Sequence, residues 1–139
     1  MWVDNRVIAA IEGGLFLLVG IAASDDEKDV RAAVDKIVGL RVFADSEGKM
    51  NLSVGEVGGE ILVVSQFTLL GDVRRGRRPS FTAAAAPEVA KPLIDRMVEA
   101  FRESGVPTRQ GRFGARMQVE SVNDGPVTLI LEIGNATVG

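Results

Sequence analysis

The feature that most constrains the fold is residues 61–67, a run of mainly apolar and β-branched side chains. Such a strand is typically buried on both faces, because neither face carries the polar residues of an exposed side. We therefore expect it to be the central strand of a covered sheet. The chain has 139 residues and no internal repeat, which is long enough to bury such a core. We interpret residues 1–139 as a single domain.

Two amphipathic helices are predicted. The first follows Ser24-Asp25-Asp26-Glu27, a capping-box pattern, and ends near Gly39. The second ends near Gly105, but its start is open, since Pro87 suits a first helical position and Pro92 would break a helix begun there. Their apolar faces are Val30, Ala33, Val34 and Ile37 in the first helix, and Leu93, Ile94, Met97, Val98 and Phe101 in the second.

Shorter apolar runs predict the remaining strands. Residues 7–11 and 15–21 are joined by Glu12-Gly13-Gly14, which indicates a hairpin. Further strands are expected at residues 40–43, 50–52, 108–113, 116–122 and 127–133. This order predicts an α+β fold with a mostly antiparallel sheet and two covering helices.

The composition restricts the chemistry. The chain has no His and no Cys, which excludes a Ser-His-Asp triad, a Cys-His dyad, histidine zinc sites and disulfides. The net charge of −3 gives no overall attraction to nucleic acid. Seven of the 16 basic residues nevertheless lie in two short segments, one with Arg74, Arg75, Arg77 and Arg78 close to Phe81, and the other with Arg109, Arg112 and Arg116. This pattern suits a phosphate backbone and a stacked base, and the alternative is a solvated basic loop.

Polar residues end the central strand, as Ser65, Gln66, Phe67 and Thr68. Ser65 or Thr68 could be a nucleophile, but neither has a histidine to activate it. Unpaired backbone N–H groups could instead form an oxyanion hole. The structural alternative is a strand that leaves the sheet with its hydroxyls bonded to backbone.

The segment from Asn123 to Thr128 lies between two predicted strands and contains Gly125-Pro126. An ordinary turn and a functional loop both fit it, because proline begins a strand poorly and an X-Pro bond can be cis. The apolar residues 14–23 are too few to span a bilayer, so we expect a cytoplasmic protein without a membrane partner.

Taken together, these residues resemble the D-aminoacyl-tRNA deacylase family. Residues 65–69 match its SQFTL motif, and residues 123–128 match its N-x-G-P-V-T motif. The agreement covers nearly the whole chain in order and continues through Leu40-Arg41-Val42-Phe43, Gly48-Lys49-Met50-Asn51-Leu52-Ser53, Gly58-Gly59-Glu60, Gly76-Arg77-Arg78-Pro79-Ser80-Phe81 and Phe113-Gly114-Ala115.

The resemblance implies a hydrolase that cleaves the ester between a D-amino acid, or mischarged glycine, and the 3′-terminal adenosine of tRNA. It implies a β-barrel-like sheet arrangement with two helices, and a homodimer with its active sites at the interface. It also implies no cofactor and no metal. A cis Gly125-Pro126 bond, with Asn123, Val127 and Thr128 around it, would enter the partner's pocket and exclude L side chains. Ser65, Gln66, Phe67 and Thr68 would line the opposite wall, and Arg74, Arg75, Arg77 and Arg78 would bind the tRNA.

Two departures from the family pattern matter. Members usually begin with a further strand that carries a Gln-Arg-Val stretch, and its absence is expected to expose a sheet edge and loosen support for the Gly-Pro loop. Leu70-Gly71 stands where Tyr-Ala is more usual. The alternative function is therefore a tRNA-binding module with impaired catalysis. A structural domain without an RNA role is the third possibility.

Overall fold

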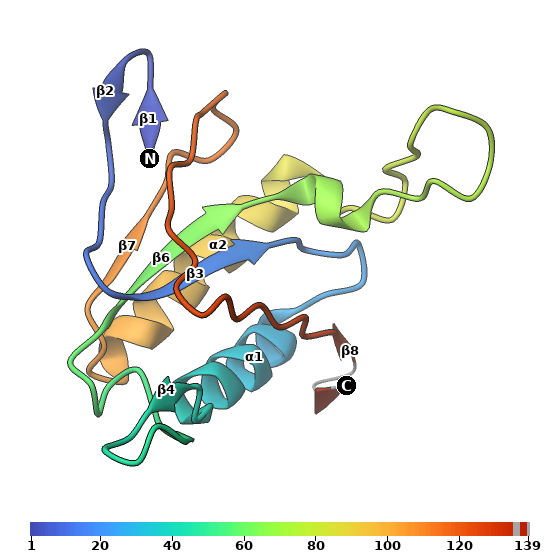
Figure 1. Cartoon of the computed structure of the whole chain (residues 1–139). Helices are drawn as coiled ribbons and strands as arrows, with labels where there is room; N and C mark the ends of the chain where they lie inside the picture. Colours follow the sequence, from blue (N-terminus) through green and yellow to red (C-terminus); the bar gives the residue numbers. More distant parts are fainter. Residues whose placement is uncertain (135–136, 139) are drawn as a thin grey trace.

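The computed structural model describes residues 1–134 and the backbone of residues 137–138. Figure 1 shows a small sheet, two helices, and a long loop that extends away from the end of the sheet. Among the described residues, the helices are too short or too polar to cross a bilayer.

The principal sheet consists of β3 (Gly14–Val19), β6 (Glu60–Ser65) and β7 (Thr108–Gln110), with β6 in the centre. The central position of β6 was predicted, and its Ile61, Val63 and Val64 are at most 1% exposed. The prediction of a mostly antiparallel sheet was wrong here, because both pairings are parallel. Each connection between these strands contains a helix, which returns the chain to the starting edge of the sheet.

The predicted hairpin at Glu12-Gly13-Gly14 was also wrong. Gly14 begins β3 with φ +143°, and a Cβ there would lie 1.8 Å from the Glu60 carbonyl oxygen. The Glu60 N–H donates to the Gly13 carbonyl at 2.9 Å. These glycines therefore allow two parallel backbones to approach closely, and they do not reverse the chain.

Both helices form where the apolar spacing predicts them. α1 (Glu27–Gly39) is capped by Asp26, which accepts from the Asp29 N–H while the Asp29 side chain accepts from the Asp26 N–H. α2 (Pro87–Glu103) begins at Pro87 and continues through Pro92. Arg96 of α2 links the two helices, because its Nε lies 3.0 Å from Oε1 of Glu27 in α1. Arg96 also forms ion pairs with Glu99 and Glu103 of its own helix.

The two faces of the sheet have different covers. Both helices pack on the face that carries Ile61 and Val63, and together they form the main core. Leu62 and Val64 point to the opposite face, where Met1 and other N-terminal residues cover them. Phe16 and Leu18 of β3 are partly uncovered, with 37% and 46% of their surface exposed.

The remaining strands are short. β1 (Trp2–Val3) pairs with β2 (Arg6–Val7), β4 (Phe43–Ala44) with β5 (Met50–Leu52), and β8 (Ile133–Gly134) with β9 (Thr137–Val138), all antiparallel. In the described part of the chain these ladders do not close into a barrel. The overall result is an α+β domain with mixed sheets and two helices.

The strands predicted at residues 116–122 and 127–133 were largely wrong. Only Gln118, in an isolated bridge to Trp2, and Ile133, in β8, have strand pairing. Val122 and Ile130 are 94% and 85% exposed. Alternating apolar residues favour a strand only where a neighbouring strand accepts their backbone bonds, and no neighbour pairs with residues 119–132 within the described chain.

Candidate functional site

The first candidate stretch lies at the carboxyl end of the parallel sheet. Val19 and Ser65 are register partners at the ends of β3 and β6, and the Gln66 N–H donates to the Val19 carbonyl at 2.8 Å. The chain then turns into the 3₁₀ helix η1 (Phe67–Leu70). The carboxyl ends of parallel strands are a common place for ligands, since the chain leaves the sheet there with backbone groups unpaired.

The backbone at the start of η1 supplies two free donors. The Phe67 and Thr68 N–H groups make no hydrogen bond within the described chain, as expected for the first residues of a helix. Both residues are exposed, whereas Ser65 and Gln66 are half-buried. This arrangement can stabilise a negative oxygen without a charged side chain.

A side-chain contact orders the same turn. The Gln66 amide Nε2 donates to Thr68 Oγ1, which leaves the hydroxyl proton of Thr68 available as a donor. The Phe67 ring packs edge-to-face against Phe81, with 5.1 Å between ring centroids. Among the described residues the Thr68 hydroxyl is bonded only to the Gln66 amide and not to a base, so Thr68 makes a poor nucleophile, although its hydroxyl can donate to a ligand.

The second candidate stretch is the exposed segment from Asn123 to Thr128, in which the Gly125-Pro126 bond is cis. Asn123 braces it from within, since its Oδ1 accepts from the Val127 N–H at 2.9 Å and its Nδ2 donates to Thr128 Oγ1 at 2.8 Å. Gly125 has φ +137°, and a Cβ there would lie 2.9 Å from Val127 Cγ2. The segment is thus a defined loop that needs glycine at position 125.

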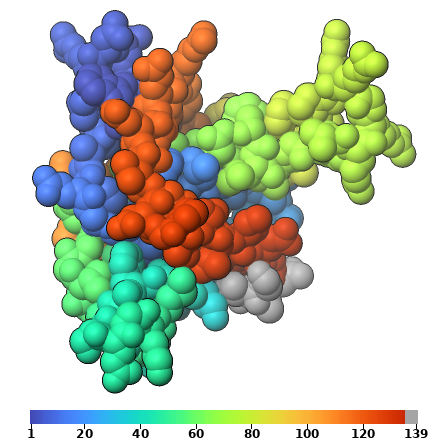
Figure 2. Space-filling model, viewed as in Figure 1, coloured from blue at the N-terminus to red at the C-terminus, as the bar shows by residue number. Residues whose placement is uncertain are grey.

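The two stretches are not joined within one chain. Among the described residues no hydrogen bond connects residues 65–68 with residues 123–128. In Figure 2 the residues from about 120 to 132 form a band across the visible surface. Residues 65–68 and residues 123–128 are therefore two groups without a hydrogen bond between them in the described chain.

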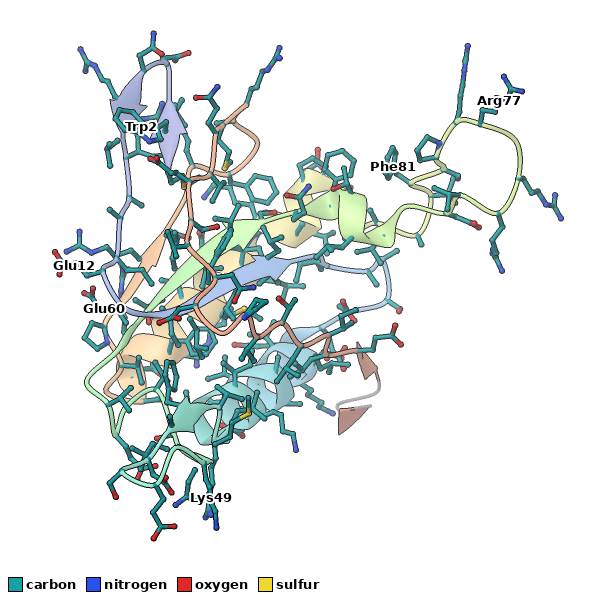
Figure 3. All side chains as sticks on the ribbon, viewed as in Figure 1. Trp2, Glu12, Lys49, Glu60, Arg77 and Phe81 are labelled. Carbon is teal, nitrogen blue, oxygen red and sulfur yellow. The ribbon has the colours of Figure 1, made fainter. Side chains whose placement is uncertain are left out.

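The arginine loop is the third candidate. Asp72 and Ser80 close its base through two backbone hydrogen bonds of 2.7 and 2.8 Å. Figure 3 shows Arg77 at the far end of the loop and Phe81 near its base. An open hollow of about 460 Å³ at the base is lined by Asp72, Arg74, Arg75 and Ser80.

Sequence reasoning missed Asp72, which binds Arg74 through its carboxylate. The Arg74 guanidinium lowers the pKa of the Asp72 carboxyl below its ordinary value, and Asp72 in turn raises the pKa of Arg74. An Asp placed two residues before an Arg in a turn could have indicated this pair, because Asp commonly accepts from the N–H two residues later.

The comparisons with known proteins agree on a family. Residues 1–132 match the family described as D-Tyr-tRNA(Tyr) deacylase. The chain belongs to this family. A protein of Thermotoga petrophila named D-aminoacyl-tRNA deacylase is 52% identical over 94% of this chain and 87% of its own length. A protein of the same name from Geobacter metallireducens is 53% identical over 99% of this chain and 91% of its own length.

Solved structures share the fold of this chain. The structure described as c-Myc DNA Unwinding Element Binding Protein has a TM-score of 0.86 and 41% identity, over 92% of this chain and 87% of that one. A probable eukaryotic D-amino acid tRNA deacylase shares the fold with a TM-score of 0.56, over 73% of this chain and 74% of its own, at 22% identity. The resemblance of the two sequence motifs to this family is thus confirmed at the level of the whole chain.

Proposed function

We propose that this protein is an enzyme that hydrolyses the ester between a D-amino acid, or mischarged glycine, and the 3′-terminal adenosine of tRNA. The observation that carries the proposal is family membership over residues 1–132, together with relatives named D-aminoacyl-tRNA deacylase at 52–56% identity. The products are the free D-amino acid and tRNA with a free 3′ end. We place this activity in the cytoplasm, where charged tRNA is used.

The reaction needs little from the side chains. An aminoacyl ester is already activated, and the neighbouring ribose hydroxyl can assist the attack of water on the carbonyl carbon. As the tetrahedral intermediate forms, its oxygen would accept from the N–H groups of Phe67 and Thr68, which are free in the described chain. The bond from carbon to ribose oxygen then breaks. Gln66 would hold the Thr68 hydroxyl in place, and Ser65 would line the pocket behind them.

Rejection of L-aminoacyl-tRNA is proposed to be steric. The exposed Gly125-Pro126 segment, held by Asn123 and Thr128, would enter the pocket of a second copy in a homodimer and occupy the space of an L side chain. Its exposure, and the absence of any hydrogen bond to residues 65–68 of its own described chain, support contribution to a partner's site. A steric barrier made of backbone atoms does not depend on the identity of the side chain, so esters of many D-amino acids should be hydrolysed.

The arginine loop is proposed to bind the tRNA. Four guanidiniums at positions 74, 75, 77 and 78 suit phosphate oxygens, and the exposed Phe67 and Phe81 rings offer a surface for a base. The alternative of a tRNA-binding module without catalysis is not favoured, because the similar relatives are named as deacylases over most of their length.

The deciding experiment incubates the purified protein with D-aminoacyl-tRNA and, separately, with L-aminoacyl-tRNA that carries the same amino-acid side chain. We expect release of the D-amino acid and survival of the L-ester over the same period. Equal hydrolysis of both esters would contradict the stereochemical proposal, and salt-sensitive tRNA binding without release of either amino acid would indicate the binding module.

A further inference from the structure

The arginine loop has a base that does not depend on its side chains. The Asp72 N–H donates to the Ser80 carbonyl at 2.7 Å, and the Ser80 N–H donates back to the Asp72 carbonyl at 2.8 Å. Gly76 takes φ +61° within the loop, a conformation suited to glycine. Backbone contacts thus close the base of the loop.

Three hydrogen bonds from Arg74 converge on the Asp72 carboxylate. The Arg74 Nε and Nη2 donate at 2.9 and 2.7 Å, and its backbone N–H donates at 3.0 Å. The guanidinium therefore covers the carboxylate with its planar fork, and this geometry makes the strongest type of arginine pair. Arg75, Arg77 and Arg78 form no ion pair among the described residues.

From this difference we propose that Asp72 is a positioning residue that keeps the Arg74 guanidinium from binding RNA. Arg74 would then stabilise the loop through its ion pair, and the other three arginines would bind phosphate groups. The inference rests on the proposed tRNA function, and it deepens that function by naming Arg75, Arg77 and Arg78 as the residues that meet phosphate. It reduces the four arginines predicted from the sequence to three that would contact phosphate.

The proposal determines how many arginines contribute to the salt dependence of tRNA binding. Each phosphate neutralised by a cation releases counterions, so the logarithm of the binding constant falls with the logarithm of salt concentration by about 0.7–0.9 per contact. A guanidinium already neutralised by Asp72 adds nothing to that slope. Three arginines should therefore contribute to the slope.

The test measures binding of deacylated tRNA across a salt series, with single substitutions in the intact protein. Arg75→Gln, Arg77→Gln and Arg78→Gln should each lower the slope by about 0.7–0.9, because each removes a cation that has no ion pair among the described residues. Lys49→Gln is the matched control, because Lys49 is an exposed cation that pairs with Glu47 at 3.8 Å. Figure 3 shows Lys49 at the opposite end of the molecule from Arg77, so its removal should not change the slope.

The decisive comparison is a double substitution. Asp72→Asn removes the charge that holds Arg74, so the slope should rise by about 0.7–0.9 as Arg74 becomes a fourth phosphate ligand. Adding Arg74→Gln to Asp72→Asn should return the slope to the starting value. A merely structural role for Asp72 would change affinity in both variants without this reversal.

A second readout needs no RNA. The exchange of the Arg74 Nε–H proton with solvent can be measured in the free protein by ¹⁵N NMR, and we expect it to be slow. Exchange should be faster in Asp72→Asn and unchanged in Arg77→Gln. The proposal is overturned if the double substitution Asp72→Asn with Arg74→Gln lowers the slope as much as Arg77→Gln does. It is also overturned if Asp72→Asn alone leaves the slope unchanged.

The two proposals fail separately. The slopes can follow the expected pattern in a protein that releases no D-amino acid, in which case the deacylase proposal alone falls. Normal release of D-amino acid with four equivalent arginines would remove only the role given to Asp72.

Discussion

At the scale of single residues, the proposed chemistry rests on backbone atoms that side chains hold in place. Phe67 and Thr68 offer free N–H groups, while Gln66 and Asn123 hold neighbouring hydroxyls in place. This division suits a sequence without histidine or cysteine. It also means that ordinary alanine substitutions at the strand end leave the proposed oxyanion donors intact, so proline is needed to remove one.

Phe67→Pro should remove one donor while keeping the chain path, because proline is well tolerated at the first position of a helix. We expect the rate of D-aminoacyl-tRNA hydrolysis to fall by about 10²–10³-fold, the usual effect of losing one oxyanion donor. Phe67→Ala is the control, since it removes the ring and keeps the N–H. Equal losses in the two variants would assign the effect to the ring that packs on Phe81.

Gly125→Ala should disturb the proposed chiral wall. An alanine at φ +137° is strained, and its Cβ would lie 2.9 Å from Val127 Cγ2, so we expect the segment to shift. The ratio of D- to L-ester hydrolysis should fall by at least about tenfold, or 1.4 kcal/mol of discrimination. Gly39→Ala is the matched control, because a Cβ at Gly39 meets nothing within 4 Å. An unchanged ratio in Gly125→Ala would contradict the role of this segment.

At the scale of elements, short polar contacts join the segments around the sheet edge. Before α1, the Asp25 carboxylate accepts from the Ala22 N–H at 2.7 Å, and Ala23 and Ala85 connect residues 21–23 with residues 83–85. Burial raises the pKa of Asp25, and the nearby Asp29 and Asp26 charges raise it further. The ionised form of Asp25 is therefore less favourable in the folded protein than in the unfolded chain.

The sign of this shift predicts a pH dependence. A carboxyl with a raised pKa in the folded state destabilises the fold above that pKa, and the cost disappears as pH falls and the group is protonated. Asp25→Asn should thus raise the melting temperature at pH 7, and its advantage should shrink toward pH 4. Asp35→Asn, at an exposed position of α1, is the control. A lower melting temperature for Asp25→Asn at pH 7 would show that the bond to Ala22 requires the charge.

Helices were predictable from sequence, but the pairing of strands was not. The spacing of Val30, Val34 and Ile37, like that of Ile94 and Phe101, depends only on local periodicity and a buried face. Strand direction depends on which segments meet, and the Gly13-Gly14 pair has the composition of a turn although it serves close packing against Glu60. The strand predictions within residues 116–133 were wrong for a related reason: an alternating apolar pattern does not provide a neighbouring strand to pair with.

At the scale of the whole molecule, the family and its two motifs can be recognised in the sequence, whereas the position of one motif relative to the other cannot. Residues 65–68 and 123–128 are separated in sequence and share no hydrogen bond in the described chain. The spacing of Asp72 and Arg74 could have indicated their ion pair, whereas the backbone bonds between Asp72 and Ser80 that close the loop depend on the fold. Family resemblance located the motifs, and the geometry of a single chain leaves their assembly to a second copy under the proposed function.

The proposed shared site predicts complementation between two defective chains. Phe67→Pro spoils the oxyanion side, and Gly125→Ala spoils the wall contributed to the partner. After unfolding and refolding together in equal amounts, half of randomly paired dimers would contain one of each chain and thus one intact site. Half of the Gly125→Ala chains would then receive an intact wall, so L-ester hydrolysis per Gly125→Ala chain should fall to roughly half on mixing, whereas D-ester hydrolysis per such chain should not change. Unchanged L-ester hydrolysis on mixing would indicate that each chain builds its site alone.

The parallel sheet also affects how the chain can be made. β3 is complete at Val19, but its ladder partner β6 ends only at Ser65, with the whole of α1 in between. Ribosomes add about 5–20 residues per second, so β3 emerges a few seconds before the strand it pairs with. During that interval its Leu15, Phe16, Leu17 and Leu18 have no sheet to join. Protection of a nascent apolar segment is thus a requirement that this topology places on the cell.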